Sequence, residues 1–430
     1  MLFRSGIHDR PPGFGIGGCG VTVHLKMAWR NVWRNRRRSL LTMAAIAFAC
    51  ALLVFMLSFH FGSYEAMINA AVKVHTGYFQ VQAPGYQEKR EIDQVVEHPG
   101  AVAELLAADP DVTAYTFRAS AFSLASSDDR TYGVSVTGID PSREPGVSTI
   151  RTLVREGAFL AGGDGPQALL GSLLARNLRV GLGDSWTLLG QGRDGVIAAT
   201  VATVKGIFSS GQDDFDRSAL YLPLDYFQEV YDMRGAVHEV VGVCPSLWKV
   251  PQVMRRLAPA LERQAEPLVV LDWKAIMPGL AQGIYLDLVS GLIFYLLLIV
   301  VVAFSIMNTF LMAIFERTRE FGVLMAIGTT TGRLTRLLLT ESMMMTLMGT
   351  AAGMALGAAV TLYFQAVGID FGSASEILRQ YGIPGRMHPV LTLPSLLIGP
   401  LLVCFITFWA ALWPALRVRR LTPVKAMGDA

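Results

Sequence analysis

Residues Leu288–Phe315 read LVSGLIFYLLLIVVVAFSIMNTFLMAIF, and this stretch decides the class of fold. It contains no Asp, Glu, Lys or Arg. A helix needs about 20 apolar residues to cross the hydrocarbon layer of a membrane, and this run is longer. Buried helices of soluble proteins rarely keep so long an apolar run, so the stretch predicts a membrane-spanning helix.

Three more runs have the same character: Leu40–Phe61, Leu337–Phe364 and Leu391–Leu412, among which only Glu341 carries a charge. Only 17% of the residues are charged, against about 25% in soluble domains. The first run is too long for the apolar part of a signal peptide and lacks a small-x-small cleavage pattern, so we expect a retained anchor. The sequence therefore predicts four transmembrane helices.

Basic residues flank these runs on one side of the membrane. They are Lys26, Arg30, Arg34 and Arg36 to Arg38 before the first run, Arg317, Arg319, Arg333 and Arg336 between the second and third, and Arg417, Arg419, Arg420 and Lys425 after the fourth. By contrast, Ser63–Asp287 holds 27 Asp and Glu against 19 Lys and Arg. Because cytoplasmic loops are enriched in Lys and Arg, we expect both termini in the cytoplasm and the large segment outside.

The large segment has the pattern of an α+β domain. Short runs rich in Val, Thr and aromatic residues, bounded by turn residues, predict strands at Tyr78–Gln82, Tyr132–Ile139, Trp186–Leu189, Val196–Phe208 and Val237–Cys244. Helical patterns at Pro99–Ala108 and Val250–Gln264 lie between them. In Ala168–Leu189 a strand, a short helix and a Gly-Leu-Gly-Asp turn back into a strand are expected.

Motifs for catalysis are missing from these 430 residues. No G-x-x-x-x-G-K-[ST] loop or G-x-S-x-G elbow occurs. His238-Glu239 begins like H-E-x-x-H, but Gly242 stands where the second zinc ligand is required. Gly13–Gly18 matches G-x-G-x-x-G without a preceding strand. We therefore expect a chain that is not an enzyme, with no catalytic, metal or cofactor site of its own and no nucleic-acid partner.

Two features of the membrane segments carry more information. Gly349, Gly353 and Gly357 recur every fourth residue, so they share one helix face that lets another backbone approach. General bundle packing and a specific subunit contact both explain them.

The segment Glu316–Gly328 predicts a short amphipathic helix across the membrane face, with Phe321, Leu324, Met325 and Gly328 on one side. It either docks a partner or only anchors the bundle.

The stretch MNTFLMAIFERTREFGVLMAIGTTTGRLTRLLLTES, which includes this segment, resembles the signature of the FtsX-like permease family of mechanotransmitting ABC transporters. Three other stretches are similar to pieces of that family in the same order: AWRNVWRNRRRSLLT (Ala28–Thr42), GSLLARNLRVGLGDSWTL in the large domain, and ALWPALRVRRLTPVKAMG (Ala411–Gly428). Met427 departs from the family's usual Leu. HTGYFQVQAPGY (His75–Tyr86) resembles the LolC/LolE branch, which releases lipoproteins from the inner membrane.

The resemblance implies a bacterial inner-membrane subunit that binds no cofactor, while ATP is bound by a separate ABC ATPase dimer. It also implies a second, identical or paralogous permease, contact with the lipid bilayer, and a lipoprotein or other amphiphile as substrate. The ATPase-coupling residues would be Glu316, Arg317, Arg319, Glu320, Phe321, Leu324 and Gly328. In this interpretation Phe321 and Leu324 are exposed anchors, and Arg317 and Arg319 lie nearer the rim.

Other functions stay open at this point. A permease of the same architecture could export a peptide or toxin or regulate cell-wall hydrolases, and a membrane sensor with an extracellular ligand domain is an alternative of another class.

The expected fold is membrane α-helical, with four transmembrane helices and a large α+β periplasmic domain inserted between helices 1 and 2. The expected boundaries are a disordered extension at 1–26, with Met27 as a candidate start, an amphipathic helix and first span at 27–62, a two-lobed periplasmic domain at 63–283, the second span at 284–315, a coupling loop at 316–336, the third span at 337–364, a periplasmic loop at 365–390, the fourth span at 391–413 and a cytoplasmic tail at 414–430.

Overall fold

The computed structural model describes residues 19–417 except 129, 265, 373–374 and 376–384. The chain divides into two compact units. We call the first the membrane unit; it comprises the residues up to Gly62, then Leu288–Gly368, and those from His388 onward. The second, the α+β domain, comprises Ser63–Asp287 and Ile369–Met387. The segments expected at 1–26 and 414–430 lie largely outside the described residues.

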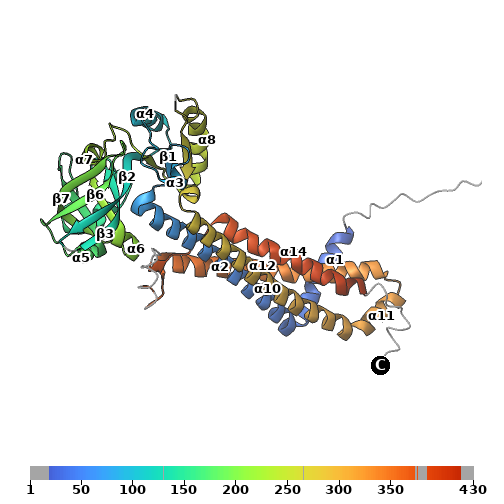
Figure 1. Ribbon diagram of the computed structural model, residues 1–430. Coiled ribbons are helices and arrows are strands. Elements are labelled where there is room, and N and C mark those ends of the chain that lie inside the picture. Colours follow the sequence, from blue (N-terminus) through green and yellow to red (C-terminus); the bar gives the residue numbers. More distant parts are fainter. Residues whose placement is uncertain (1–18, 129, 265, 373–374, 376–384, 418–430) are drawn as a thin grey trace, which may run out of the picture. The chain divides into compact units, whose positions relative to one another are not determined.

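The described part of the chain contains four helices that are long and apolar enough to cross a membrane (Figure 1). They are α2 (Arg36–Ala71), α10 (Pro278–Glu316), α12 (Thr331–Val367) and α14 (Leu393–Arg417). Helices α2, α10 and α12 each contain one of the apolar runs of the sequence, α14 begins two residues into the fourth run, and the α+β domain is inserted between α2 and α10. The predicted fold class is therefore confirmed.

The membrane unit has its own apolar core. Ile46 and Leu53 of α2 pack with Ile306 and Phe310 of α10 and with Met345 of α12. Many other apolar side chains of the long helices are exposed, among them Phe294, Val301 and Phe304 of α10 and Leu401 and Phe405 of α14. An apolar outer surface around an apolar core is what a bundle surrounded by lipid requires.

Gly349, Gly353 and Gly357 lie on the face of α12 that packs against α2. A Cβ atom added at Gly353 would come within 2.5 Å of the carbonyl oxygen of Ala47, and one at Gly357 within 2.9 Å of Cβ of Val54. The glycines therefore let two helices of the same chain approach closely.

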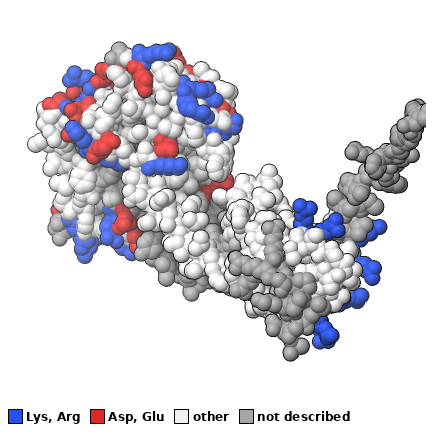
Figure 2. Space-filling model, turned by 90° about the vertical axis from the view of Figure 1, so that its right-hand side faces the viewer, with Lys and Arg blue, Asp and Glu red and all other residues white. Residues whose placement is uncertain are grey.

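Two shorter helices accompany the bundle: α1 (Cys19–Arg34) and α11 (Thr318–Ala326). Helix α1 buries Ala28 and Val32, one turn apart, and exposes Trp29 and Arg30. Figure 2 shows the basic side chains of the membrane unit gathered at one end, beyond a band almost free of charge. Exposed basic residues of α1 and of the first two turns of α2, α11 and α12 are Lys26, Arg30, Arg34, Arg36, Arg37, Arg319, Arg333 and Arg336.

The α+β domain is built on a ten-stranded sheet, with the order β10-β1-β9-β2-β3-β8-β5-β7-β4 and β6 pairing with β2 and β7. The strands are β1 (Phe79–Gln82), β2 (Ala114–Ser127), β3 (Arg130–Ile139), β4 (Val154–Gly157), β5 (Gln167–Gly171), β6 (Ser185–Gln191), β7 (Ile197–Phe208), β8 (Ala219–Pro223), β9 (Glu239–Val243) and β10 (Val269–Asp272). The pair β11 (Ile369–Asp370) and β12 (Arg386–Met387) forms a separate small sheet. Two lobes were expected; one continuous sheet connects all the strands from β1 to β10.

Helices and short turns complete this domain. They are α3 (Tyr86–Lys89), α4 (Pro99–Ala108), α5 (Ser172–Leu178), α6 (Asp213–Ser218), α7 (Leu224–Val230), α8 (Val250–Leu261), α9 (Trp273–Ile276), the π-helical turn η1 (Val72–Thr76) and the 3-10 turns η2 (Glu144–Gly146), η3 (Ile150–Leu153) and η4 (Leu247–Lys249). One core cluster includes Phe79, Val136, Trp186 and Val240, and a second surrounds Phe208 and Tyr221. The predicted strand–helix–turn–strand of Ala168–Leu189 is confirmed, with Gly183 at φ +84° in the turn.

Candidate functional site

Helix α11 connects the ends of two spanning helices through a sharp reversal. It begins after Arg317, whose backbone is not helical, and ends before Gly328, which adopts φ +101°. Only glycine takes that conformation without strain, so it stops the helix cleanly. The N–H of Thr329 then donates to the carbonyl of Leu324, and α12 begins directly afterwards. The sequence thus fixes α11 as a separate helix between α10 and α12.

One side of α11 is built into the membrane unit. Phe321 is only 3% exposed and packs with Ile314 of α10 and with Leu334 and Leu338 of α12. Leu324 is half-buried against the same cluster. This corrects the expectation that Phe321 is an exposed anchor, because the buried side chain of Phe321 holds α11 in place. The apolar face of α11 that includes Phe321 and Leu324 is turned toward the bundle.

The opposite side of α11 is accessible. Arg319, Val323 and Ile327 follow one another at intervals of four residues and are all exposed. Val323 is 46% and Ile327 79% exposed. We call these three residues the outer face of α11. Two aliphatic side chains beside one cation form a small surface that could bind an apolar groove.

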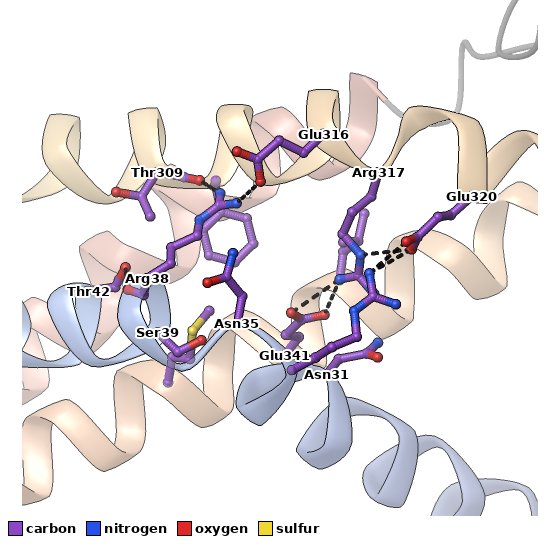
Figure 3. A pocket seen from close by; sticks show the side chains of 14 residues that line it. Asn31, Asn35, Arg38, Ser39, Thr42, Thr309, Glu316, Arg317, Glu320 and Glu341 are labelled. Carbon is purple, nitrogen blue, oxygen red and sulfur yellow. Dashed lines mark hydrogen bonds and ion pairs between the residues drawn. The ribbon is translucent and has the colours of Figure 1, made fainter.

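Glu320 follows Arg319 of this face in the sequence, and its carboxylate is held by two arginines (Figure 3). Nη2 of Arg34 on α1 donates to both of its carboxylate oxygens at 2.8 Å, and Nε of Arg317 lies 3.3 Å from Oε2. The bond from Arg34 and the nearby charges hold the pKa of Glu320 below its usual value. Glu320 is therefore an anion that fastens α1 to α11.

Arg317 continues the chain of ion pairs into α12. Its Nη1 lies 3.2 Å from Oε2 of Glu341, and both side chains are largely buried. The guanidinium also lies over the ring of Phe321, 5.7 Å from the centroid. A separate pair, Arg38 Nη1 with Glu316 Oε2 at 2.8 Å, connects α2 with the end of α10. We call the residues Arg34, Arg38, Glu316, Arg317, Glu320 and Glu341 the ionic network.

The ionic network surrounds a cavity of about 290 Å³ whose lining includes Asn31, Asn35, Ser39 and Thr309 (Figure 3). Five helices therefore meet through charges at the same end of the membrane unit. Sequence reasoning missed Arg34 and Arg38 as partners, because about 280 residues separate these arginines from their glutamates. The only signal of the two arginines in the sequence was the cluster of basic residues. Glu341 lies only 24 positions after its partner Arg317 and stands out in the sequence only as the one charge in the apolar runs.

His238, the first residue of the incomplete H-E-x-x-H motif, lies in the interior of the α+β domain. His238 is fully buried; its Nδ1 accepts from the N–H of Ser120 at 3.0 Å and its Nε2 lies 3.1 Å from the carbonyl of Ile92. Burial lowers its pKa to about 4, so the imidazole is neutral. Among the residues that the structure describes, no group of His, Cys, Asp or Glu is placed to hold a metal ion.

Comparisons with known proteins match both parts of the chain. Residues 292–423 match the family model described as FtsX-like permease C-terminal. Residues 39–260, more than half of the chain, match the model described as MacB-like periplasmic core domain.

Relatives of two kinds are similar to the chain. The lipoprotein-releasing system transmembrane protein LolC of Xylella fastidiosa (strain Temecula1) is 23% identical over 303 residues, which cover 67% of this chain and 71% of LolC. The macrolide export ATP-binding/permease protein MacB of Pectobacterium atrosepticum is 32% identical over 126 residues, or 29% of this chain and 16% of that protein. Among solved structures, the periplasmic region of MacB from Actinobacillus actinomycetemcomitans aligns with 49% of this chain and 94% of its own, with 14% identity and a TM-score of 0.34.

Proposed function

The chain belongs to the FtsX-like permease family, with a MacB-like periplasmic core domain, and on this premise we propose that it couples ATP hydrolysis by a separate ATPase to the release of lipoproteins from the inner membrane. It is a multi-pass membrane subunit of a non-catalytic family of ABC-type permeases. The observation that carries the substrate proposal is the likeness to LolC, which extends over 303 residues and two thirds of the chain.

We assign the docking of the ATPase to the outer face of α11. Val323 and Ile327 would enter a groove of the ATPase, and Arg319 would orient it from the rim. Glu316, Arg317, Glu320, Phe321, Leu324 and Gly328, the other residues expected in coupling, would act indirectly: they hold α11 rigidly against the bundle. A rigid helix suits this task because binding energy then is not spent on ordering it.

The ionic network would pass the docking motion on. If the ATPase tilts α11, Glu320 pulls on Arg34 of α1, and Arg317 pulls on Glu341 of α12. The Arg38–Glu316 pair ties α2 to the end of α10. This proposal puts α11 and the basic end of the bundle in the cytoplasm and the α+β domain in the periplasm, as the distribution of Lys and Arg supports.

A second permease, identical or paralogous, completes the proposed transporter together with an ATPase dimer. The similarity to a macrolide export protein over 126 residues favours a second candidate substrate class, a small amphiphile. For either substrate class, the transporter would do mechanical work on a molecule that is partly embedded in the outer leaflet.

Reconstitution tests the proposal. Proteoliposomes would contain this chain, alone or with a paralogous permease, its partner ABC ATPase and a fluorescently labelled triacylated lipoprotein. We expect the lipoprotein to leave the membrane for a soluble acceptor only when ATP is present, with no release from a Walker-lysine variant of the ATPase. ATP hydrolysis by a stable complex without lipoprotein release, but with efflux of an amphiphilic dye, would contradict lipoprotein release and favour the second candidate.

A further inference from the structure

The α+β domain holds the end of α2 by its backbone carbonyls. Helix α2 passes into the π-helical turn η1 at Val72, and Gly77 ends that turn at φ +71°. The last carbonyls of a helix have no partner within it, so they need donors from elsewhere. Single π-helical turns are frequent at functional sites.

Three of these carbonyls bind donors from different parts of the domain. The N–H of Thr149, in the loop after η2, donates to the carbonyl of Lys73 at 2.8 Å. Nη1 of Arg118 on β2 donates to that of His75. Nε2 of Gln80 on β1 donates to that of Thr76 at 2.8 Å. The end of the helix is thus attached to β1, to β2 and to the η2–η3 loop.

Arg118 is the charged member of this set, and it is completely buried. Its Nη2 and Nε bind the two carboxylate oxygens of Glu144 at 2.5 and 3.2 Å, and Glu144 is buried as well. Glu144 accepts two further bonds, from the hydroxyls of Ser148 at 2.6 Å and Thr116 at 3.3 Å. The guanidinium is therefore fixed in a geometry that aims its remaining nitrogen at the carbonyl of His75.

Stability alone gives little reason for such a pair. Removing two charges from water costs much of what their attraction returns, and apolar residues of similar size often serve the fold equally well. An apolar pair, however, cannot donate to a helix-end carbonyl, where a cation is also favoured by the helix dipole. The side chain of His75 adds to the attachment, since its Nδ1 lies 2.9 Å from the hydroxyl of Tyr221 on β8.

We propose that Arg118, oriented by Glu144, is a positioning residue that locks the end of α2 to the sheet, so that movement of α2 moves β2 and its neighbours as one body. The mechanical role rests on the proposed function, whereas the lock itself does not. Without it, movement of α2 would be absorbed by the unwinding of η1.

Hydrogen exchange on the full-length chain in lipid nanodiscs tests the lock without any partner. The variant Arg118→Met with Glu144→Gln removes the charges and the bond to His75 but keeps an acceptor for Ser148. The buried acid Glu239 lies opposite Arg118 in the sheet; burial raises its pKa, and loss of the Arg118 charge raises that pKa further. We expect amides of residues 70–78 to exchange about tenfold faster, while the β6–β7 pair keeps its wild-type rate.

The matched control is another ion pair of the same domain. Arg256 on α8 binds Asp109 through two bonds of 2.7 Å, far in the chain from η1. Arg256→Met with Asp109→Asn should leave exchange at residues 70–78 unchanged. A wild-type rate at 70–78 in the folded Arg118 variant, or an equal rise in the control, would overturn the lock.

Two further measurements keep the inference testable. If the double variant does not fold, Arg118→Lys keeps a cation beside Glu144 but loses the planar fork that reaches both Glu144 and the carbonyl of His75, and a several-fold faster exchange at 70–78 is expected; a wild-type rate would overturn the lock. In proteoliposomes, lipoprotein released per ATP hydrolysed should fall at least about fivefold in the double variant, while binding of the ATPase stays normal. An unchanged ratio overturns the mechanical role, whereas absence of release in the wild type overturns the proposed function instead.

Discussion

At the scale of single residues, the apolar side chains of α11 have two different surroundings that the sequence pattern does not distinguish. Phe321 and Ile327 are both apolar, but the first is 3% and the second 79% exposed. A large side chain enclosed by Ile314, Leu334 and Leu338 contributes to the stability of the bundle. An equally apolar side chain with no cover can contribute to stability only when something binds over it.

We therefore expect Phe321→Ala to destabilise the membrane unit by about 3–5 kcal/mol, because it leaves a cavity between α10, α11 and α12. Thermal unfolding of the purified chain in detergent would measure the change. Val323→Ala, on the exposed side of the same helix, is the control and should change stability by less than about 0.5 kcal/mol. Equal melting temperatures for the two variants would contradict the burial of Phe321.

His238 makes the stability of the α+β domain depend on pH. The unfolded chain takes up a proton on this residue near pH 6.5, but the folded chain only near pH 4. Between these values the unfolded state binds more protons, so the free energy of unfolding falls as the pH falls. From pH 7 to pH 5 this residue should cost about 2 kcal/mol.

Urea unfolding of the full chain at pH 5, 6 and 7 would test this, with His238→Gln for comparison. The two proteins share all other titrating groups, so the difference between their pH slopes isolates His238. We expect the flatter slope for the variant. Parallel slopes would mean that His238 is protonated in the folded domain.

At the scale of elements, the contact between α2 and α12 depends on the absence of side chains. A Cβ at Gly353 would lie 2.5 Å from the carbonyl oxygen of Ala47 and 2.6 Å from Cβ of Cys50. Because backbone atoms cannot give way as side chains do, the helices must separate. Gly332, on the same helix, has open space where its Cβ would be.

Gly353→Ala should therefore lower the stability of the membrane unit by about 1–3 kcal/mol. Gly332→Ala should leave it unchanged or raise it slightly, because alanine favours helix more than glycine does. Thermal unfolding in detergent compares the two. A loss of similar size in both variants would show that helix propensity, and not close packing, decides the effect.

The elements also show how far sequence reasoning extends. The four apolar runs identified all four spanning helices, and Val- and aromatic-rich runs identified β1, β3, β6, β7 and β9. Strand β2, the longest, was missed because its alanines and serines and the buried Arg118 do not resemble a strand. Its pairing with β3, β6 and β9 supplies the stability that its composition does not.

The candidate site was predictable in position but not in orientation. The period of Phe321, Leu324 and Met325 identified a helix with one apolar face. A short amphipathic helix does not reveal whether that face meets its own bundle or a partner. The ionic network could not be predicted from the sequence for another reason: nothing in the sequence pairs Arg34 with Glu320, which is 286 positions away.

At the scale of the whole molecule, the proposed topology puts the turn after α11 and the α+β domain on opposite sides of the membrane. Ser185, before Trp186 in the α+β domain, and Thr330, before α12, are both exposed. In a background with the native cysteines replaced, a membrane-impermeant maleimide should label Ser185→Cys in spheroplasts. Thr330→Cys should react only after the membrane is permeabilised. Labelling of both without permeabilisation would contradict the four-span topology.

A separate ATPase that docks on the outer face of α11 should bind less tightly when that face carries an acid, and a binding titration of the ATPase to the purified chain in detergent measures this. Ile327→Glu places a charge on the most exposed aliphatic residue of that face and touches no residue of the core. We expect it to weaken ATPase binding at least about tenfold, or about 1.4 kcal/mol, with an unchanged melting temperature. Wild-type affinity in the folded Ile327→Glu variant would contradict docking at this face.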